Sequence, residues 1–335
     1  MNTHNSTFPP DQVLNRDSFF ASNLRSARLK DFLFGKLIQL NAIAAIAIVF
    51  LIFIYVGKEA LPVFYSAEAR KEASLDNLFA RQNYGTEDMP LSFVWQPVSE
   101  VPKYSVLPLF LGSLKVTLVA LFFAAPLAIA AAIYTAEFSS YKVREIVKPI
   151  VELLAGIPSV VLGFLALMVM ATWLQDLFHF DYRLNAINAG LALGIAIIPI
   201  IYTVSEDALT AVPRSYREAS LALGVSPWKT AWSVVLPAAT PGIFAALVLG
   251  FGRAIGETMI VLMASGNAAI TSLSFTDSVR TLSATIAAEL GEVVNGSPHY
   301  SVLFLLGAML FVVTFILNML GEVFVGRLKR KMMGT

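Results

Sequence analysis

The feature that most limits how this chain can fold is a series of long apolar runs. Residues 37–56 form the first run, and about 20 consecutive apolar residues are enough to cross the hydrocarbon core of a bilayer. Further runs follow at 107–134, 150–173, 187–204, 241–263 and 301–325. Backbone polar groups in lipid find no water to bond, so each run is expected to be helical. The sequence therefore predicts an all-α, polytopic membrane protein with six transmembrane helices.

The composition agrees with this prediction and excludes several other classes of protein. Of 335 residues, 57% are hydrophobic and 14% charged, whereas about a quarter are charged in an average soluble domain. The net charge of +1 gives no indication of a nucleic acid partner. The chain has no cysteine, and its three histidines lack the spacing of a metal site. No GxxxxGK[ST] phosphate loop is present, so we expect no cofactor in this chain and ATP, if used, on another.

Polar segments between the runs give the domain organisation. We expect an N-terminal tail at 1–36, flexible over residues 1–30, and a first transmembrane helix at 37–56. An external loop at 57–106, a core with five transmembrane helices at 107–326 and a C-terminal tail at 327–335 would follow. Lysine and arginine gather in both tails, at 142–148 and at 207–240, and such residues mark the cytoplasmic side of a membrane. Both termini are therefore predicted to be cytoplasmic.

Small residues and periodicity predict two further features of the core. Gly190 and Gly194 lie four residues apart on one helix face, which permits close contact with another helix. Apolar residues recur every three to four positions between Val279 and Val293. This spacing predicts a short amphipathic helix, with Thr276 or Asp277 as its cap.

Two charges lie within the fifth predicted span. Arg253 falls about midway along it, where a charge costs on the order of 3 kcal/mol even on the lenient insertion scale. Glu257 is four residues further on, so the two side chains are expected to share a helix face and to pair. Gly252 and Gly256 would let another helix approach beside them. The pair either fixes helix packing or forms a functional site, and an ionisable residue inside the membrane favours the second.

As a functional site, this pair would suit an oxyanion. The guanidinium of Arg253 offers a planar fork of donors to two oxygens. Glu257 would either neutralise Arg253 in the empty site or accept a hydrogen bond from a protonated oxyanion, which would separate phosphate from sulfate. Thr258 would add a hydroxyl. Lys115 is a weaker candidate, because a lysine near a helix end can extend to the interface.

A polar segment just before the fifth run has the features of a surface helix. Its pattern consists of Glu218, Ala219, Ser220, Gly224, Leu236 and Pro237. We expect a short helix at about 214–226, ended by Gly224, because glycine readily takes the left-handed conformation that terminates helices. An ordinary amphipathic loop helix is the alternative interpretation.

This spacing resembles the EAA-x3-G-x9-I-x-L-P pattern with which ABC importer permeases dock on their ATPase. Ser220 stands in place of the second alanine and Val234 in place of isoleucine. The run GRAIGETM at 252–259 is similar to one in phosphate importer permeases, and the following SGN resembles their C-type (PstC-like) subunit. In the same family, the GIPS break at 156–159 resembles a segment near the translocation path, although a packing kink explains it equally well.

The resemblance implies a type I ABC importer permease fold and a subunit that forms half of a phosphate pathway in a bacterial inner membrane, surrounded by membrane lipid. It implies a PstA-like second permease, a PstB-like ATPase dimer that carries ATP and Mg, and a PstS-like phosphate-binding protein. The chain itself would not be an enzyme. Two alternatives stay open. One is a permease of the same fold that transports sulfate or molybdate, and the other is a non-transporting membrane receptor or assembly subunit.

Overall fold

The computed structural model describes residues 10–81, 92–99 and 102–333. Its first helix is α1 (Pro10–Ala60), and the part of the chain up to Tyr55 forms a unit of its own. A candidate membrane span at Asp31–Tyr65 includes the first predicted one. The flexibility predicted for residues 1–30 is wrong from Pro10 onward, where the backbone is helical and no proline interrupts the helix between its first position and the span. Residues 1–9 lie outside the described part.

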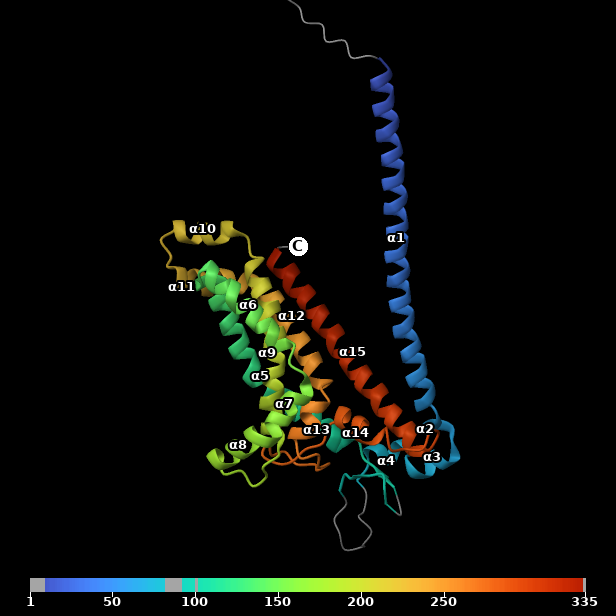
Figure 1. Cartoon of the computed structure of the whole chain (residues 1–335). Helices are drawn as coiled ribbons and strands as arrows, with labels where there is room; N and C mark the ends of the chain where they lie inside the picture. Colours follow the sequence, from blue (N-terminus) through green and yellow to red (C-terminus); the bar gives the residue numbers. More distant parts are fainter. Residues whose placement is uncertain (1–9, 82–91, 100–101, 334–335) are drawn as a thin grey trace, which may run out of the picture. The chain divides into compact units, whose positions relative to one another are not determined.

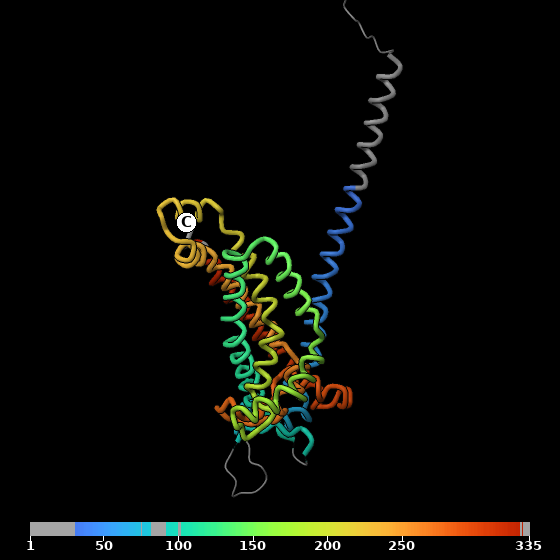
Figure 2. Tube along the Cα trace, turned by 60° about the vertical axis from the view of Figure 1, so that its left-hand side comes forward, coloured from blue at the N-terminus to red at the C-terminus, as the bar shows by residue number. Residues whose placement is uncertain are grey.

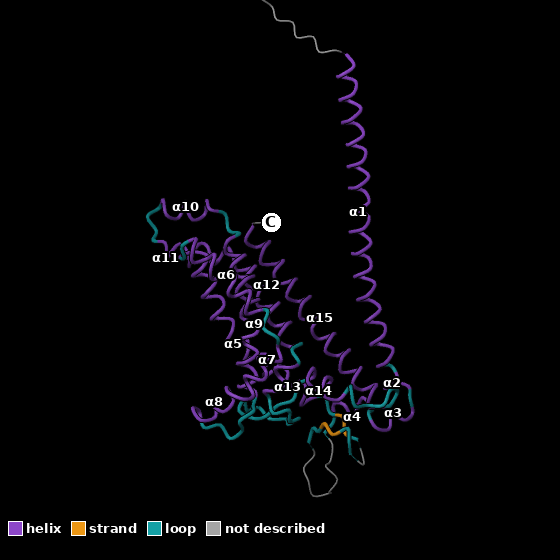
Figure 3. The backbone as a smooth tube through the Cα atoms, in the orientation of Figure 1, coloured by secondary structure: helices purple, strands orange, loops and turns teal. Residues whose placement is uncertain are grey.

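The segment 57–106, predicted as an external loop, contains several short elements. They are α2 (Pro62–Tyr65), α3 (Ala67–Glu72), α4 (Leu75–Phe79) and the antiparallel strands β1 (Trp95–Gln96) and β2 (Lys103–Tyr104). Figure 3 shows the two strands in orange. Buried Leu78 and Trp95 form one apolar cluster with Val302 and Leu306 of α15 (Pro298–Met333). The segment is therefore a folded layer that packs on the core.

Two helices in contact, α5 (Leu107–Ile133) and α9 (Ala186–Thr210), form the centre of the core, and α12 (Leu236–Ile255) packs on α9. A π-helical turn, η1 (Tyr134–Phe138), continues α5. A Cβ atom added to Gly190 would lie 2.5 Å from Val119 on α5, and one added to Gly194 would lie 2.8 Å from Phe123. The close helix contact predicted from these two glycines is therefore confirmed.

The third predicted span is divided into several helices. Helix α6 (Tyr141–Ala155) comes first, and after a break the chain continues as α7 (Ser159–Leu165), the π-helical turn η2 (Ala166–Met170) and α8 (Ala171–Phe178). The candidate span is Ser159–Phe178, so the start predicted at residue 150 is wrong. Pro158 causes the break, because it has no N–H for a helical bond and disfavours helical backbone in the residue before it.

The chain returns to the membrane earlier than predicted. Helix α10 (Arg214–Ala222) is followed by α11 (Pro227–Thr230), the π-helical turn η3 (Ala231–Val235) and α12. The candidate span is Pro227–Ile255, and a separate helix α13 (Met259–Ala264) follows the break at Gly256. The bounds predicted at 241–263 are therefore wrong at both ends. Pro237 lies in the first turn of α12, where helices tolerate the missing N–H group.

The last predicted elements are present with shifted ends. Helix α14 (Leu282–Glu289) has Thr281 as its cap, and the Thr281 side chain accepts a hydrogen bond from the backbone N–H of Ala284. The predicted caps Thr276 and Asp277 are therefore wrong. Helix α15 includes the sixth predicted span and extends into the predicted C-terminal tail.

Six candidate membrane spans occur among the described residues, as the sequence predicts. In the core, α10 lies at one end of the helix bundle and α14 at the other, and the two views in Figures 1 and 2 agree on this arrangement. Features at these two ends can therefore be compared as opposite poles of one bundle.

Candidate functional site

Helix α10 is joined to the core through Arg217. Its guanidinium donates hydrogen bonds to both carboxylate oxygens of Glu137 in η1, with Nε 3.1 Å from Oε2 and Nη2 2.6 Å from Oε1. It also donates to the backbone carbonyl of Val212 at 2.6 Å and to that of Leu209 at 2.9 Å. The Arg217 and Glu137 side chains are largely buried, at 21% and 9% exposure. Arg217 therefore connects α10 to the end of α9 and to the turn after α5.

Two of the predicted docking residues have internal roles. Ser220 is buried, and its hydroxyl lies 2.9 Å from that of Thr230 on α11. Gly224 follows the end of α10 with a φ of 77°, a left-handed conformation that favours glycine. The prediction that Gly224 ends this helix is therefore confirmed, and the serine in place of the family's alanine is explained by its bond to Thr230.

The remaining docking residues divide into two groups. Glu218 and Ala219 on α10 are exposed, and in the described part of the chain the Glu218 side chain has no hydrogen bond or ion pair. Leu223 beside them is 84% exposed. Leu236 and Pro237 instead begin α12 and are not part of α10. The outer surface of α10 therefore offers a carboxylate and apolar side chains to another molecule.

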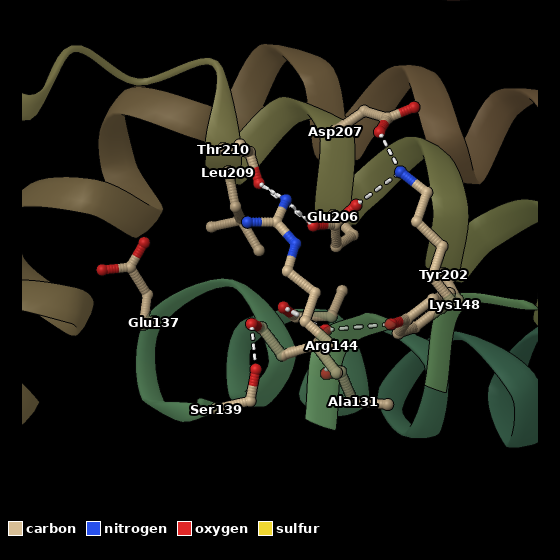
Figure 4. Close-up of polar contacts among 12 residues, drawn as sticks. Ala131, Glu137, Ser139, Arg144, Lys148, Tyr202, Glu206, Asp207, Leu209 and Thr210 are labelled. Carbon is tan, nitrogen blue, oxygen red and sulfur yellow. Dashed lines mark hydrogen bonds and ion pairs between the residues drawn. The ribbon is translucent and has the colours of Figure 1, made fainter. Parts of the chain in front are cut away.

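Near α10, a buried carboxylate joins α6 to α9 (Figure 4). Glu206, whose side chain is fully buried, makes ion pairs with Arg144 and with Lys148, the second at 3.1 Å. Lys148 also lies 3.0 Å from Asp207, and Arg144 donates to the hydroxyl of Thr210 at 2.8 Å. The hydrogen bond to Asp207 raises the pKa of Lys148 above its ordinary 10.5; burial opposes this shift, and Glu206 adds to it.

The sequence pattern does not predict this cluster, because the basic residues at 142–148 indicate only the cytoplasmic side of the membrane. The structure places Arg144 and Lys148 one helical turn apart in α6. A signal was available in Glu206, a carboxylate that lies two residues after the end of an apolar run. A buried carboxylate requires a partner, and the basic residues of the neighbouring polar segment were the obvious candidates.

The structure separates Arg253 from Glu257. Arg253 lies in the last turn of α12 and not midway along the span. Glu257 lies in the break after α12, where its carboxylate accepts a hydrogen bond from the backbone N–H of Thr258 at 3.1 Å. No ion pair joins Arg253 to Glu257 among the described residues. The predicted pairing is wrong because the helix ends at Ile255, before the four-residue spacing is complete.

Arg253 instead faces a hollow between α6, α9 and α12. The hollow has a volume of about 310 Å³, and its polar lining residues are Glu152, Thr203 and Arg253. Thr258 lines a different hollow with Ser283 of α14. The structure therefore does not bring the three predicted pathway residues into one site, and it adds two residues that the sequence analysis did not single out.

Two other features of the predicted pathway have structural explanations. The ammonium group of Lys115, a buried residue, donates a hydrogen bond to the backbone carbonyl of Ser274 at 2.8 Å. Gly252 lies against Asn318 of α15, since a Cβ atom added there would lie 3.4 Å from the Asn318 amide oxygen. A Cβ atom added to Gly256 would meet only backbone of its own helix. The predicted helix approach is thus present at Gly252 alone.

At the opposite end of the bundle, Glu289 of α14 is surrounded by donors. Arg280 Nη2 lies 2.5 Å, His299 Nε2 3.2 Å and Trp95 Nε1 3.1 Å from its carboxylate oxygens. Burial alone would raise the pKa of Glu289, but hydrogen bonds from His299 and Trp95 and the charge of Arg280 lower it below the ordinary 4.5. The cluster therefore joins β1, α14 and α15.

Comparisons with known proteins identify the family and several relatives of this chain. Residues 124–333 match the family described as binding-protein-dependent transport system inner membrane component. The probable ABC transporter permease protein YqgH of Bacillus subtilis is 36% identical over 235 residues, which cover 69% of this chain and 76% of the relative. Phosphate transport system permease protein PstC of Mesorhizobium japonicum is 36% identical over 242 residues, which cover 67% of this chain and 73% of the relative.

The solved structures agree on the fold. A chain in the crystal structure of a bacterial alginate ABC transporter, in complex with an alginate pentasaccharide-bound periplasmic protein, has a TM-score of 0.55 at 18% identity. The match covers 88% of this chain and 94% of that one. Six spans with this arrangement define a permease of the type I ABC importer fold, a non-catalytic, multi-pass component of the inner membrane. The chain belongs to the family of binding-protein-dependent transport system inner membrane components.

Proposed function

We propose that this permease forms half of the translocation pathway of an ATP-driven importer for inorganic phosphate. Relatives named phosphate transport system permease protein PstC support this choice of solute. The observation that carries the proposal is the position of Arg253. Arg253 is an exposed residue, has no ion pair within the described residues and lines the 310 Å³ hollow between three helices. A planar fork of donors in such a place suits two oxygens of an oxyanion.

The partners follow from the family and from the surface of α10. A PstA-like permease would complete the pathway, and a PstS-like protein would deliver phosphate. A PstB-like ATPase dimer, with ATP and Mg bound to it, would receive the exposed side of α10 at Glu218, Ala219 and Leu223. Because Arg217 connects α10 to α9, a movement of the ATPase would be transmitted to the helix that lines the hollow.

The same assignment gives the orientation in the membrane. The end of the bundle that carries α10 would face the cytoplasm, where the ATPase binds. Basic residues gather at this end, among them Lys142, Arg144 and Arg214. Both chain termini are then cytoplasmic, and the layer built from residues 57–106 faces outward.

The test is ATP-dependent uptake of radiolabelled phosphate into proteoliposomes that hold the complete transporter. We expect uptake by the wild type to resist a large excess of sulfate or molybdate. Arg253→Ala should abolish uptake while the ATPase still copurifies with the variant, and Arg253→Lys should restore little, since an ammonium group lacks the planar fork.

Uptake that sulfate or molybdate suppresses would contradict phosphate as the solute. Uptake that survives in Arg253→Ala would exclude Arg253 from the pathway and leave the choice of solute intact. Arg327→Ala, which removes an exposed arginine of α15 and leaves the docking helix α10 unchanged, controls for the loss of one positive charge.

A further inference from the structure

We infer that Glu152 of α6 is the carboxylate that recognises the proton of the transported oxyanion, opposite Arg253. This inference rests on the proposed function and extends it, because it names the residue that would separate hydrogen phosphate from sulfate. The sequence pattern offers this role to Glu257 as one of two alternatives, whereas the structure places Glu152 in the hollow with Arg253.

The hollow has the contents expected of an oxyanion site. Three helices each contribute one polar side chain to it, with Glu152 from α6, Thr203 from α9 and Arg253 from α12. None of the three side chains has a hydrogen bond or ion pair in the part of the chain that the structure describes. One water molecule needs about 10–15 Å³ of cavity volume. The hollow, at about 310 Å³, therefore has room for a tetrahedral oxyanion together with water.

Glu152 is held in place by its own helix. Arg144, Lys148 and Glu152 follow one another at four-residue spacing in α6 and so lie along one face of it. The first two are paired with Glu206 of α9, one turn from Thr203. The ion pairs therefore fix the face of α6 that carries Glu152 against the part of α9 that lines the hollow.

Glu257 has a different environment. Its carboxylate accepts a hydrogen bond from the N–H of Thr258, and its backbone carbonyl accepts one from Ser283 at 2.7 Å. These bonds hold the break between α12 and α13. Glu257 is not among the residues that line the hollow with Arg253. The two carboxylates are therefore distinguishable by experiment.

The chemistry depends on a space between opposite charges. Glu152 and Arg253 line one hollow without forming an ion pair, so an anion can bind between them. Arg253 would donate to two oxygens of the anion. A carboxylate can face the same anion only if the anion donates a hydrogen bond to it, which hydrogen phosphate does. Sulfate carries no proton at neutral pH, so Glu152 would repel it.

The experiment compares Glu152→Gln with Glu257→Gln in the complete transporter. Uptake of labelled phosphate is measured in proteoliposomes against increasing sulfate. We expect Glu152→Gln to reduce the preference for phosphate over sulfate about tenfold or more, because the amide can donate to sulfate. Glu257→Gln should leave this preference within about twofold of the wild type. Copurification of the ATPase verifies assembly of each variant.

The outcomes separate this inference from the proposed function. An unchanged preference in Glu152→Gln, beside wild-type uptake and loss in Arg253→Ala, would overturn the role of Glu152 alone. A loss of preference in Glu257→Gln would return the role to that residue. Absence of phosphate uptake by the wild type would overturn the proposed function itself. If Glu152→Gln fails to assemble, Glu152→Asp takes its place, and it should keep discrimination against sulfate while uptake falls.

Discussion

The two ends of the helix bundle use the same electrostatic arrangement with different partners. Near α10, Glu206 is paired with Arg144 and Lys148, whose side chains are each 33% exposed. At the α14 end, Glu289 is paired with Arg280 and His299, which are 15% and 14% exposed. A buried carboxylate joins separate helices in both places. The difference lies in the side chains that surround the carboxylate, because these reach water at the first end and are largely enclosed at the second.

This difference predicts a larger loss of stability at the enclosed end. In Glu289→Ala, the Arg280 guanidinium would remain as an unpaired buried cation, so we expect the free energy of unfolding to fall by about 4 kcal/mol. Equilibrium unfolding in detergent micelles, followed by circular dichroism, measures this change. Glu292→Ala, which removes an exposed carboxylate nearby, is the control. A loss below about 1 kcal/mol in Glu289→Ala would remove the contrast between the two ends.

The α10 end should respond less to the equivalent change. Glu206→Ala leaves Arg144 and Lys148 partly hydrated, so we expect a loss of about 3 kcal/mol in the same measurement, near the lower limit for a broken buried pair. Asp207 is 61% exposed, and Asp207→Ala should cost less than about 1 kcal/mol. Equal losses of unfolding free energy in Glu206→Ala and Asp207→Ala would mean that the burial of Glu206 does not make its ion pairs more important for stability.

The two ends should also respond to opposite changes of pH. The lowered pKa of Glu289 stabilises the fold above its ordinary value of 4.5, and this stabilisation is lost as the pH falls through the lower folded value. The raised pKa of Lys148 stabilises the fold below 10.5 and is lost as the pH rises through the higher folded value. Hydrogen exchange should therefore increase first around α14 in acid and around α6 in alkali. Simultaneous opening of both ends would contradict this assignment.

The smallest effect is expected from the hydrogen bond between Ser220 of α10 and Thr230. Ser220→Ala restores the alanine of the family pattern but removes the hydrogen bond to Thr230, so we expect a loss of about 1 kcal/mol in the free energy of unfolding. Ser215→Ala, an exposed position in the same helix, should be neutral. If Ser220→Ala is also neutral, the hydrogen bond between Ser220 and Thr230 makes no net contribution to the free energy of unfolding.

Local patterns in the sequence predicted the features that depend on few neighbours. Long apolar runs gave six spans, and the end of α10 at Gly224 followed from the conformational freedom of glycine. The contact of Gly190 and Gly194 with α5 followed from their spacing on one face. The bounds of the third and fifth spans failed, because apolar composition continues across breaks that Pro158 and Gly256 introduce.

The sequence by itself therefore determined the class of the protein, the number of its spans and the surface helix α10, because hydrophobic length and local backbone preferences act over a few residues. Only the tertiary structure decided which charged residues are brought together. Arg253 lines one hollow with Glu152, and Glu257 is not among the residues that line it. Glu206 is paired with Arg144 and Lys148, and in both places the helices involved are distant in the sequence. Helix breaks and helix packing determine which charged side chains become neighbours, and neither can be predicted from the spacing of the charged residues along the sequence.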